Sequence, residues 1–487
     1  MTRRVWLFGL LLAVPLFSMA VAYGIDLRLN SQLRAAAHQR YPEAPPDVLA
    51  GLTLRRLCDQ DPTSSACEPA NQTRWMVRGS LFAIGLGLAL LAAMWYAGRA
   101  ARGDRLLLLR LFRPGLYITI GAVTVLIVLH AALAMAAIVM GESAFIGRVH
   151  GAFVLTIGLG AVLGLWTMFR GMASMVKAPQ TFVLGESVSR EQAPALWAKV
   201  DETARHMGAL APEHIVIGLD PSFFVTEARV ACLTGPLAGR TLYCSLPLCR
   251  ILSIDELVGI VGHELGHFKG QDTAFSAHFY PVYRGATTSL AALQSAGDGG
   301  LRQVALLPAM AVLAYFLECF SVAESEVSRE RELAADREGA GATSAQTMAT
   351  ALVKVHAFAG VWQGFDTAAA DALQQGRSFI NASKAYADTV VANASPASFE
   401  GIAETHTAHP TDSHPPLAAR LASLGVAMEA VATPALDVAP ANGALSLVDG
   451  AVAREEALSE AYQYFLAKRL GIDLTPVADE SAESPEA

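Results

Sequence analysis

The sequence has little positive charge and few cysteines. Its 487 residues include 36 Lys and Arg against 44 Asp and Glu, which gives a net charge of −8. Lys and Arg form no long stripe outside the flanks of apolar segments, so we expect no nucleic acid among its partners. The 6 cysteines are too few and too scattered for a disulfide-scaffold protein, although Cys58 and Cys67 bracket a short polar loop.

Hydrophobic residues are in excess. They make up 53% of the chain, and the mean hydropathy of +0.38 is above the range usual for soluble globular proteins. We therefore predict a lipid bilayer as a partner, with a helix or signal anchor at residues 1–23 and three more membrane helices within residues 77–172. The apolar runs that approach the roughly 20 residues needed to cross a bilayer are Val5–Tyr23, Val77–Gly98, Gly115–Met140 and Gly151–Phe169.

The first run has a second interpretation. Arg3 and Arg4, an apolar stretch and the small residues around Ala20 also fit a cleavable signal peptide, whose removal would leave the topology of the rest unchanged.

Arginines predict the orientation, because short cytoplasmic connections are enriched in basic residues. Residues 24–76 would then form an extracytoplasmic loop in which Cys58 and Cys67 could oxidise to a disulfide. The connection between the second and third runs and the chain after the fourth run, with the catalytic domain, would lie in the cytoplasm, and the protein would be a multi-pass protein of the inner cell membrane. This loop also contains Arg55, Arg56 and Arg74, which weaken the bias. The arginines between the second and third runs are Arg99, Arg102, Arg105, Arg110 and Arg113.

After Lys177 the composition changes to mixed polar and apolar residues. Alternating runs at Val225–Leu233 and Arg240–Leu246 predict strands of a small sheet. A capping box, Ser253 to Glu256, then begins a helix with an apolar face at helical spacing.

This helix contains His263, Glu264 and His267. Histidines four residues apart lie one turn apart on the same helix face, so both imidazoles can reach one zinc ion, with Glu264 beside its open position. The alternative is an amphipathic helix with solvated His and Glu. The capped helix directly after strands favours the metal site.

A catalytic zinc normally has three protein ligands and a water, so a third ligand must come from elsewhere in the chain. The best source is the segment 328–337, which is predicted to be helical. Glu332 could ligate the ion while Asp336, one turn further, orients a ligand histidine. Taken alone, the segment fits a charged, solvated helix face better than a ligand helix, because Arg and Glu alternate along it.

Together these motifs resemble the family of HtpX and the type 1 CAAX prenyl proteases, which are integral-membrane zinc metallopeptidases. The resemblance rests on the H-E-x-x-H helix followed by Glu-x-x-x-Asp within Arg-Glu-Leu-Ala-Ala-Asp-Arg, and it covers roughly Phe182 to Leu424. It implies one Zn2+ per chain, with Glu332 as third ligand and Asp336 as its partner. It also implies that His414, in a His-Pro-Pro element, helps to stabilise the tetrahedral intermediate, and that Arg420 braces the active-site carboxylates.

Two departures limit what the resemblance implies. Where the family usually has an Asn-Ala pair, this chain has Ser222, Phe223 and Phe224, so the substrate-binding residues are not assigned. Four predicted crossings also differ from the seven of the CAAX proteases, so prenylated substrates are not implied.

The predicted architecture is a transmembrane α-helical region followed by an α+β zincin-like metallopeptidase domain, mostly helical with a small sheet, at residues 178–430. A helical extension, 431–475, would contain an amphipathic helix at Val452–Leu470, and the acidic tail 476–487 would be disordered. The apolar run Val304–Ala323 is expected not to cross the membrane alone, but to be a buried helix of the catalytic domain or to lie on the membrane surface. Cys244 and Cys249 are interpreted as core or surface thiols.

The predicted function is a zinc-dependent endopeptidase acting on protein or peptide substrates, with Glu264 as general base. The alternative is a catalytically silent, chaperone-like or binding membrane protein that keeps the fold.

Overall fold

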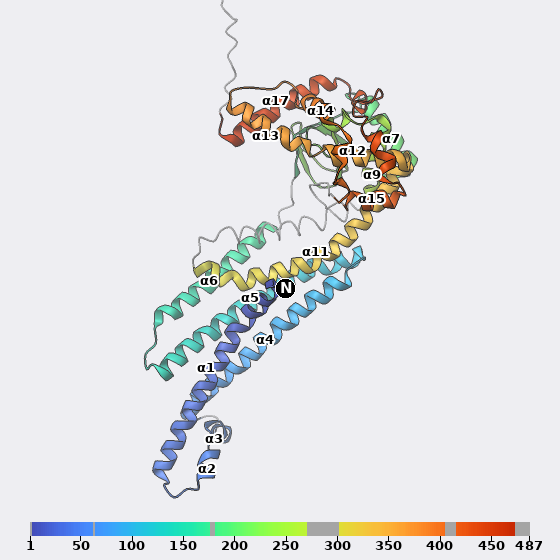
Figure 1. The fold of residues 1–487 in the computed structure, drawn as a ribbon. Helices are drawn as coiled ribbons and strands as arrows, with labels where there is room; N and C mark the ends of the chain where they lie inside the picture. Colours follow the sequence, from blue (N-terminus) through green and yellow to red (C-terminus); the bar gives the residue numbers. More distant parts are fainter. Residues whose placement is uncertain (1, 62–63, 176–180, 270–300, 405–414, 473–487) are drawn as a thin grey trace, which may run out of the picture. The chain divides into compact units, whose positions relative to one another are not determined.

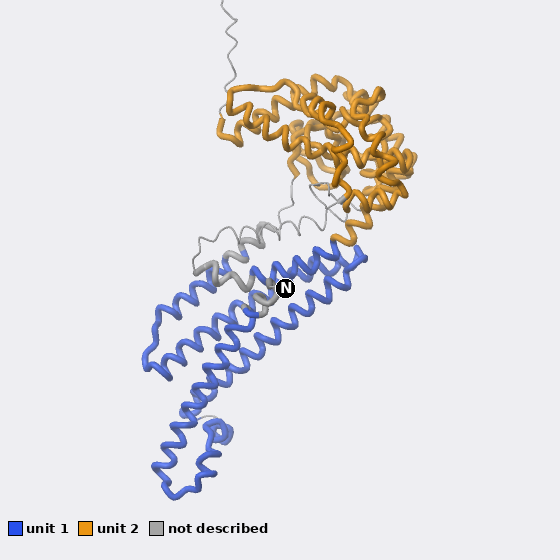
Figure 2. The backbone as a smooth tube through the Cα atoms, in the orientation of Figure 1, with its two compact units in different colours: residues 1–177, 281–324 blue, residues 178–280, 325–487 orange. Residues whose placement is uncertain are grey.

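The computed structural model describes residues 2–61, 64–175, 181–269, 301–404 and 415–472. It divides into two compact units (Figure 2). Unit 1 consists of Met1–Lys177 and Pro281–Glu324, and unit 2 of Ala178–Tyr280 and Ser325–Ala487. The first boundary falls at Lys177, where the composition of the chain changes. The predicted acidic tail, 476–487, lies outside the described residues.

Unit 1 is built from long helices (Figure 1). Among the described residues, three helical segments are long and apolar enough to cross a membrane: Leu11–Arg40, Ser65–Ala100 and Arg105–Phe145. The fourth predicted crossing falls in a shorter apolar helix, Gly151–Trp166. Its long helices in the described part of residues 1–177 are α1 (Thr2–Arg40), α4 (Glu68–Ala100), α5 (Arg105–Phe145) and α6 (Gly151–Met175).

Helix α1 extends beyond the predicted first crossing, because no proline interrupts the chain between Tyr23 and Arg40. The loop that follows contains α2 (Pro46–Gly51), α3 (Leu54–Gln60) and η1 (Ser65–Cys67).

The predicted disulfide between Cys58 and Cys67 is confirmed. Asp26 of α1 helps to hold the loop, since it pairs with Arg55 at 2.8 Å and accepts a hydrogen bond from Thr73 Oγ1 at 2.7 Å. Arg74 of α4 pairs with Asp59 of α3 at 2.6 Å, so the loop is fixed to both neighbouring helices, α1 and α4.

The apolar run Val304–Ala323 forms the first part of α11 (Leu301–Ala342). Of its two predicted placements, the buried helix of the catalytic domain is wrong, because this part of α11 belongs to unit 1. The placement on the membrane surface, without a crossing of its own, stays a prediction. Phe112 of α5 packs between Phe316 and Phe320, with ring centroids 5.5 and 5.4 Å away. The aromatic side chains of this part of α11 therefore pack on α5, within unit 1.

Unit 2 contains two small sheets. A four-stranded sheet has the order β2-β3-β7-β4, with β3 and β7 parallel and the other pairs antiparallel, and a three-stranded sheet has the order β1-β5-β6. The strands are β1 (Thr181–Phe182), β2 (Gly185–Val188), β3 (His214–Gly218), β4 (Phe224–Thr226), β5 (Val230–Cys232), β6 (Gly235–Leu237) and β7 (Thr241–Ser245).

Of the two predicted strands, Arg240–Leu246 is confirmed as β7. The prediction of a single strand over Val225–Leu233 is wrong, because the run is split between β4 and β5, which belong to different sheets. The hydroxyl of Thr226 accepts a hydrogen bond from the Ala228 backbone N–H at 3.0 Å and turns the chain there.

The helices of unit 2 surround the four-stranded sheet, and one apolar core joins them. Leu242 of the sheet, Leu257 and Leu265 of α9, Leu352 of α12 and Leu458 of α17 belong to this core. The helices are α7 (Pro194–Met207), α8 (Leu246–Cys249), α9 (Ile254–Lys269), α12 (Ala345–Phe358), α13 (Val361–Gln374), α14 (Ala382–Asn393), η2 (Pro396–Phe399), η3 (Ile402–Glu404), α15 (Leu417–Leu424), α16 (Met428–Ala435), η4 (Ala444–Leu447) and α17 (Ala451–Leu470).

The capping box at the start of α9 is confirmed. Glu256 accepts a hydrogen bond from the Ser253 backbone N–H at 2.7 Å, and Ser253 Oγ accepts one from the Glu256 N–H at 3.2 Å. The buried Lys354 of α12 donates to Glu256 at 2.8 Å and also to the carbonyl oxygens of Ile251 and Asp437. A buried ion pair therefore fixes the amino terminus of α9 to three other parts of unit 2.

The predicted helix at Val452–Leu470 is confirmed as α17, and it packs against the rest of unit 2. Its Glu455 is fully buried and accepts hydrogen bonds from Arg250 Nε at 2.7 Å and from Ser383 Oγ at 2.6 Å. A buried carboxylate with these donors ties α17 to the chain just before α9.

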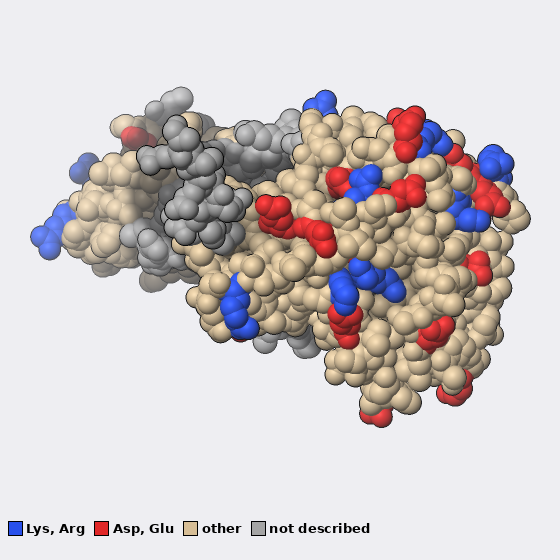
Figure 3. Space-filling view, turned by 90° about the horizontal axis from the view of Figure 1, so that it is seen from above, with Lys and Arg blue, Asp and Glu red and all other residues tan. Residues whose placement is uncertain are grey.

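Basic and acidic side chains are interspersed over the face of the molecule in Figure 3, among the residues drawn in colour. Mixed charge of this kind is typical of a solvated protein surface.

Candidate metal centre and active site

Helix α9 brings His263, Glu264 and His267 into the interior of unit 2. All three are buried, with relative exposures of 3%, 5% and 8%. The two imidazole rings stand perpendicular, with centroids 5.0 Å apart, as expected for residues one turn apart on one helix face. The alternative of a solvated histidine pair on an amphipathic helix is therefore excluded.

Helix α11 supplies the carboxylate. One oxygen of Glu332 lies 3.5 Å from His263 Nε2, and the other lies 3.5 Å from His267 Nε2. The ligand atoms of the three side chains lie within 4.8 Å of one another. Glu332 is buried, whereas Glu330 is exposed. Two imidazoles and one carboxylate at this spacing are a donor set that fits a divalent metal ion.

Glycines allow α9 and α11 to approach closely enough for this convergence. A Cβ atom on Gly339 of α11 would lie 2.5 Å from the carbonyl oxygen of Gly259 on α9, and one on Gly262 would lie 2.9 Å from Ala342 Cβ. Larger residues at these positions would force the helices apart. This contact was not predicted from the sequence, although the repeated glycines on one face of α9, Gly259, Gly262 and Gly266, are a signal of close helix packing.

Asp336 and Arg420 surround the far side of His263. Asp336 Oδ1 accepts a hydrogen bond from His263 Nδ1 at 2.9 Å, and Arg420 of α15 donates to Asp336 Oδ2 at 2.8 Å. Nδ1 of His263 carries the donated proton, so the lone pair on Nε2 is available to a metal. Nε2 is also the ring atom that faces Glu332.

The charges of this group shift two pKa values. Burial alone would raise the pKa of Asp336, but the Arg420 guanidinium outweighs it and holds the pKa well below its usual range. Burial alone would lower the pKa of His263, but its hydrogen bonds with Asp336 and Glu332 raise it to about 10. Asp336 is thus an anion at neutral pH, and a metal ion at His263 would have to displace a proton.

Comparison with known proteins identifies the family. Residues 194–427 match the model of peptidase family M48. A protease HtpX homolog of Arthrobacter sp. is 30% identical over 225 residues, which cover 45% of this chain and 74% of that protein. The chain belongs to peptidase family M48.

Other relatives are matched over smaller shares of their length. The protease HtpX homolog of Archaeoglobus fulgidus is 28% identical over 185 residues, which cover 36% of this chain and 51% of the relative. The protease HtpX homolog of Salinibacter ruber is 32% identical over 197 residues, which cover 39% of this chain and 62% of the relative. No solved structure matches the chain.

The M48 match includes every residue predicted for the metal site, and the structure brings together His263, His267 and Glu332. Asp336 and Arg420 lie beside them. His414 lies outside the described residues, so the role that the resemblance implies for it remains a prediction.

At the position of the family's Asn-Ala pair, Phe223 and Phe224 are buried. Phe224 begins β4 and stacks on Tyr243 at a centroid distance of 4.9 Å. Cys244 and Cys249 are buried free thiols, and burial raises the pKa of Cys249 to about 12. Because both are buried, the interpretation of these cysteines as core residues is confirmed. A buried thiol of this kind stays protonated at neutral pH.

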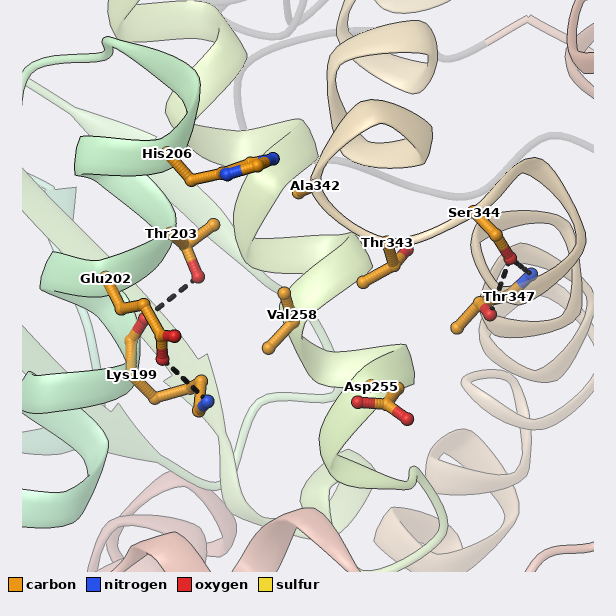
Figure 4. Close-up of a pocket in the computed structure, with 10 residues that line it drawn as sticks. All are labelled: Lys199, Glu202, Thr203, His206, Asp255, Val258, Ala342, Thr343, Ser344 and Thr347. Carbon is orange, nitrogen blue, oxygen red and sulfur yellow. Dashed lines mark hydrogen bonds and ion pairs between the residues drawn. The ribbon is translucent and has the colours of Figure 1, made fainter.

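A separate pocket of about 440 Å³ lies between α7, α9 and the start of α12 (Figure 4). Its lining is mostly polar and includes Lys199, His206, Asp255 and Thr343, and none of the metal-site residues lines it.

Proposed function

We propose that this M48 member is a membrane-bound, zinc-dependent endopeptidase. The observation that carries the proposal is the buried convergence of His263, His267 and Glu332, with Glu264 on the same turn of α9. The three side chains would hold one Zn2+ per chain, because zinc prefers imidazole and carboxylate ligands and its catalytic sites use three protein ligands.

Zinc bound there would supply Lewis acidity, which lowers the pKa of water toward about 7 and polarises a carbonyl. Glu264 takes the proton of the attacking water and later passes it to the leaving amine. Asp336 keeps His263 in the ligating tautomer, and Arg420 keeps Asp336 charged. His414 would help to stabilise the tetrahedral intermediate, as the family resemblance implies. The reaction needs no covalent bond to the enzyme.

We also propose that an extended substrate segment adds to the edge of the four-stranded sheet. β4 ends the order β2-β3-β7-β4, so its outer edge faces no other described strand of that sheet. Backbone hydrogen bonds along such an edge give weak sequence preference, which suits protein substrates of varied sequence, including membrane or misfolded proteins.

We place the protein in the inner cell membrane as a multi-pass protein, with the catalytic unit in the cytoplasm. The arginines around the junction of α4 and α5, such as Arg99, Arg102 and Arg105, support this orientation. So do the cysteines: Cys58 and Cys67 of unit 1 form a disulfide, whereas Cys232, Cys244 and Cys249 of unit 2 are free thiols. An oxidising and a reducing compartment would produce this difference.

Replacement of Glu264 by Gln tests the proposal. The variant should keep its zinc and its fold but lose cleavage of an unfolded protein substrate, because it loses the base and keeps all three ligands. Turnover and zinc content are measured on the full chain in detergent or nanodiscs, with Glu338→Gln, on the neighbouring helix, as control. If Glu264→Gln cleaves as fast as the parent chain, Glu264 is not the base. If neither chain cleaves any substrate while both bind unfolded protein, the chain is the silent, chaperone-like alternative.

A further inference from the structure

The three-stranded sheet of unit 2 has one buried face and one exposed face. Val183, Val230 and Cys232 point into a small apolar core. Strand alternation places Phe182 and Leu233 on the opposite face, where they are 58% and 43% exposed. The exposed face of this sheet is therefore also apolar.

Helix α17 extends this apolar face. Phe465 packs edge-to-face on Phe182 with ring centroids 5.7 Å apart, and Tyr464 packs on Phe465 at 5.9 Å. Tyr464 and Phe465 are themselves 56% and 40% exposed. We call Phe182, Leu233, Tyr464 and Phe465 the outer patch. Grouped exposed apolar side chains of this size usually mark an interaction surface.

The patch has basic residues close to it in the chain. Arg229, which is exposed, directly precedes β5, and Lys468 and Arg469 lie in the last turn of α17. Arg469 pairs with Asp366 at 3.3 Å, and Glu227 is exposed two residues before Arg229, so the basic character is moderate. Aromatic and apolar side chains with basic neighbours are the composition of a protein surface that lies in the interfacial layer of a membrane.

The short connection from α6 to β1 limits how far this patch can lie from the end of α6. α6 is an apolar helix of unit 1 that contacts α5, where Gly158 faces Met135, and it ends at Met175. β1 begins at Thr181, six residues later, and the patch residue Phe182 follows directly. Six residues span at most about 22 Å even when fully extended. A membrane surface at the end of α6 is therefore within reach of Phe182, whatever path the linking residues take.

We propose that the outer patch is a membrane-contact surface that inserts its aromatic side chains into the interfacial layer of the same bilayer that unit 1 spans. Phe182, Tyr464 and Phe465 lie at the level of the lipid headgroups and upper acyl chains, and Arg229 and Lys468 lie beside lipid phosphates. The contact restricts the orientation of the catalytic unit to the membrane surface. It does not depend on the metal or on the role of Glu264.

Spin labels test this contact in the full chain, reconstituted in nanodiscs that contain anionic lipid. Cys319 is replaced by Ser, so that the remaining free thiols are buried, and single cysteines are introduced as Phe182→Cys and Phe465→Cys. The control is Leu210→Cys, because Leu210 is an exposed apolar residue of the same unit, 55% exposed, outside the patch. Collision rates with molecular oxygen, which concentrates in lipid, and with a water-soluble nickel chelate are measured by power saturation.

The proposal predicts a several-fold higher ratio of oxygen to nickel collisions at residues 182 and 465 than at residue 210. A label at Leu233 should share the high ratio and lose it when Phe465→Asp is added. Equal ratios at residues 182, 465 and 210 would overturn the proposal. So would dipolar coupling between patch labels on two chains, which would show that a second copy covers the patch.

Discussion

Unit 1 and unit 2 bury different kinds of side chain. The buried residues of unit 1 are mainly apolar or carry a hydroxyl, as Phe112 and Thr73 do. Unit 2 buries whole ionic groups, including the pair of Lys354 and Glu256 and the pair of Arg420 and Asp336. Buried charges are expensive unless they are paired, whereas apolar packing tolerates modest change. Single substitutions at the ionic groups of unit 2 should therefore lower stability or metal affinity more than substitutions at polar contacts within unit 1 lower stability.

The largest effect on stability is expected at Lys354. Lys354→Met leaves Glu256 charged, buried and without its partner, which should destabilise unit 2 by about 3–5 kcal/mol. A denaturant titration of the full chain in micelles measures this change. As a matched control, the double variant Lys354→Met with Glu256→Gln should recover part of the loss, because the glutamine can still accept the Ser253 N–H without a charge. If Lys354→Met is as stable as the parent chain, the buried ionic groups of unit 2 are no more sensitive to substitution than the polar contacts of unit 1.

The next effect is expected at Asp336, where a substitution should lower the metal affinity or activity of unit 2 rather than its stability. Asp336→Asn keeps an acceptor for His263 Nδ1 but loses the charge opposite Arg420, so metal affinity or activity should fall by about 10- to 100-fold. Competition with a chelator measures the affinity. Asp371→Asn, at an exposed carboxylate on α13, should change nothing. Unchanged affinity in Asp336→Asn would show that Asp336 does not orient the ligand.

The smallest effect is expected within unit 1. Pro15 has no N–H, so the carbonyl oxygen of Leu11 lacks its helical partner, and Nε2 of His130 on α5 lies 3.1 Å from it, within hydrogen-bonding distance. His130→Phe should destabilise unit 1 by about 0.6 kcal/mol, the average for hydrogen bonds between membrane helices. The loss should shrink in a Pro15→Ala background, where the substituted residue supplies the missing N–H. Equal losses of stability in both backgrounds would show that His130 does not donate a hydrogen bond to the Leu11 carbonyl oxygen.

Short-range patterns in the sequence were sufficient to predict much of the structure. The capping box at Ser253, the helical spacing of His263 and His267 and the disulfide between Cys58 and Cys67 all depend on residues close in the chain. The i, i+4 pair of Glu332 and Asp336 could serve a metal and a histidine, but the spacing alone favoured a solvated helix face. The resemblance to a known family decided the choice of Glu332.

What the sequence did not show depends on contacts between distant elements. The apolar run in α11 has the hydropathy of a core helix and of a membrane helix alike, and contacts with distant residues such as Phe112 and Gly98 assign it to unit 1. The close approach at Gly262 and Gly339 joins helices far apart in the sequence, as does the ion pair of Lys354 and Glu256. Helical periodicity gives the exposed face of each helix but not its partner.

X-ray absorption spectroscopy at the zinc edge, on the full chain, tests the central claim most directly. We predict one zinc per chain with nitrogen and oxygen neighbours at about 2.0–2.2 Å and no sulfur at about 2.3 Å. Glu332→Ala should lose most of the zinc, because only His263 and His267 would remain, whereas Glu330→Ala should keep it. A sulfur neighbour, or zinc lost from Glu330→Ala and retained in Glu332→Ala, would contradict the assignment of the site.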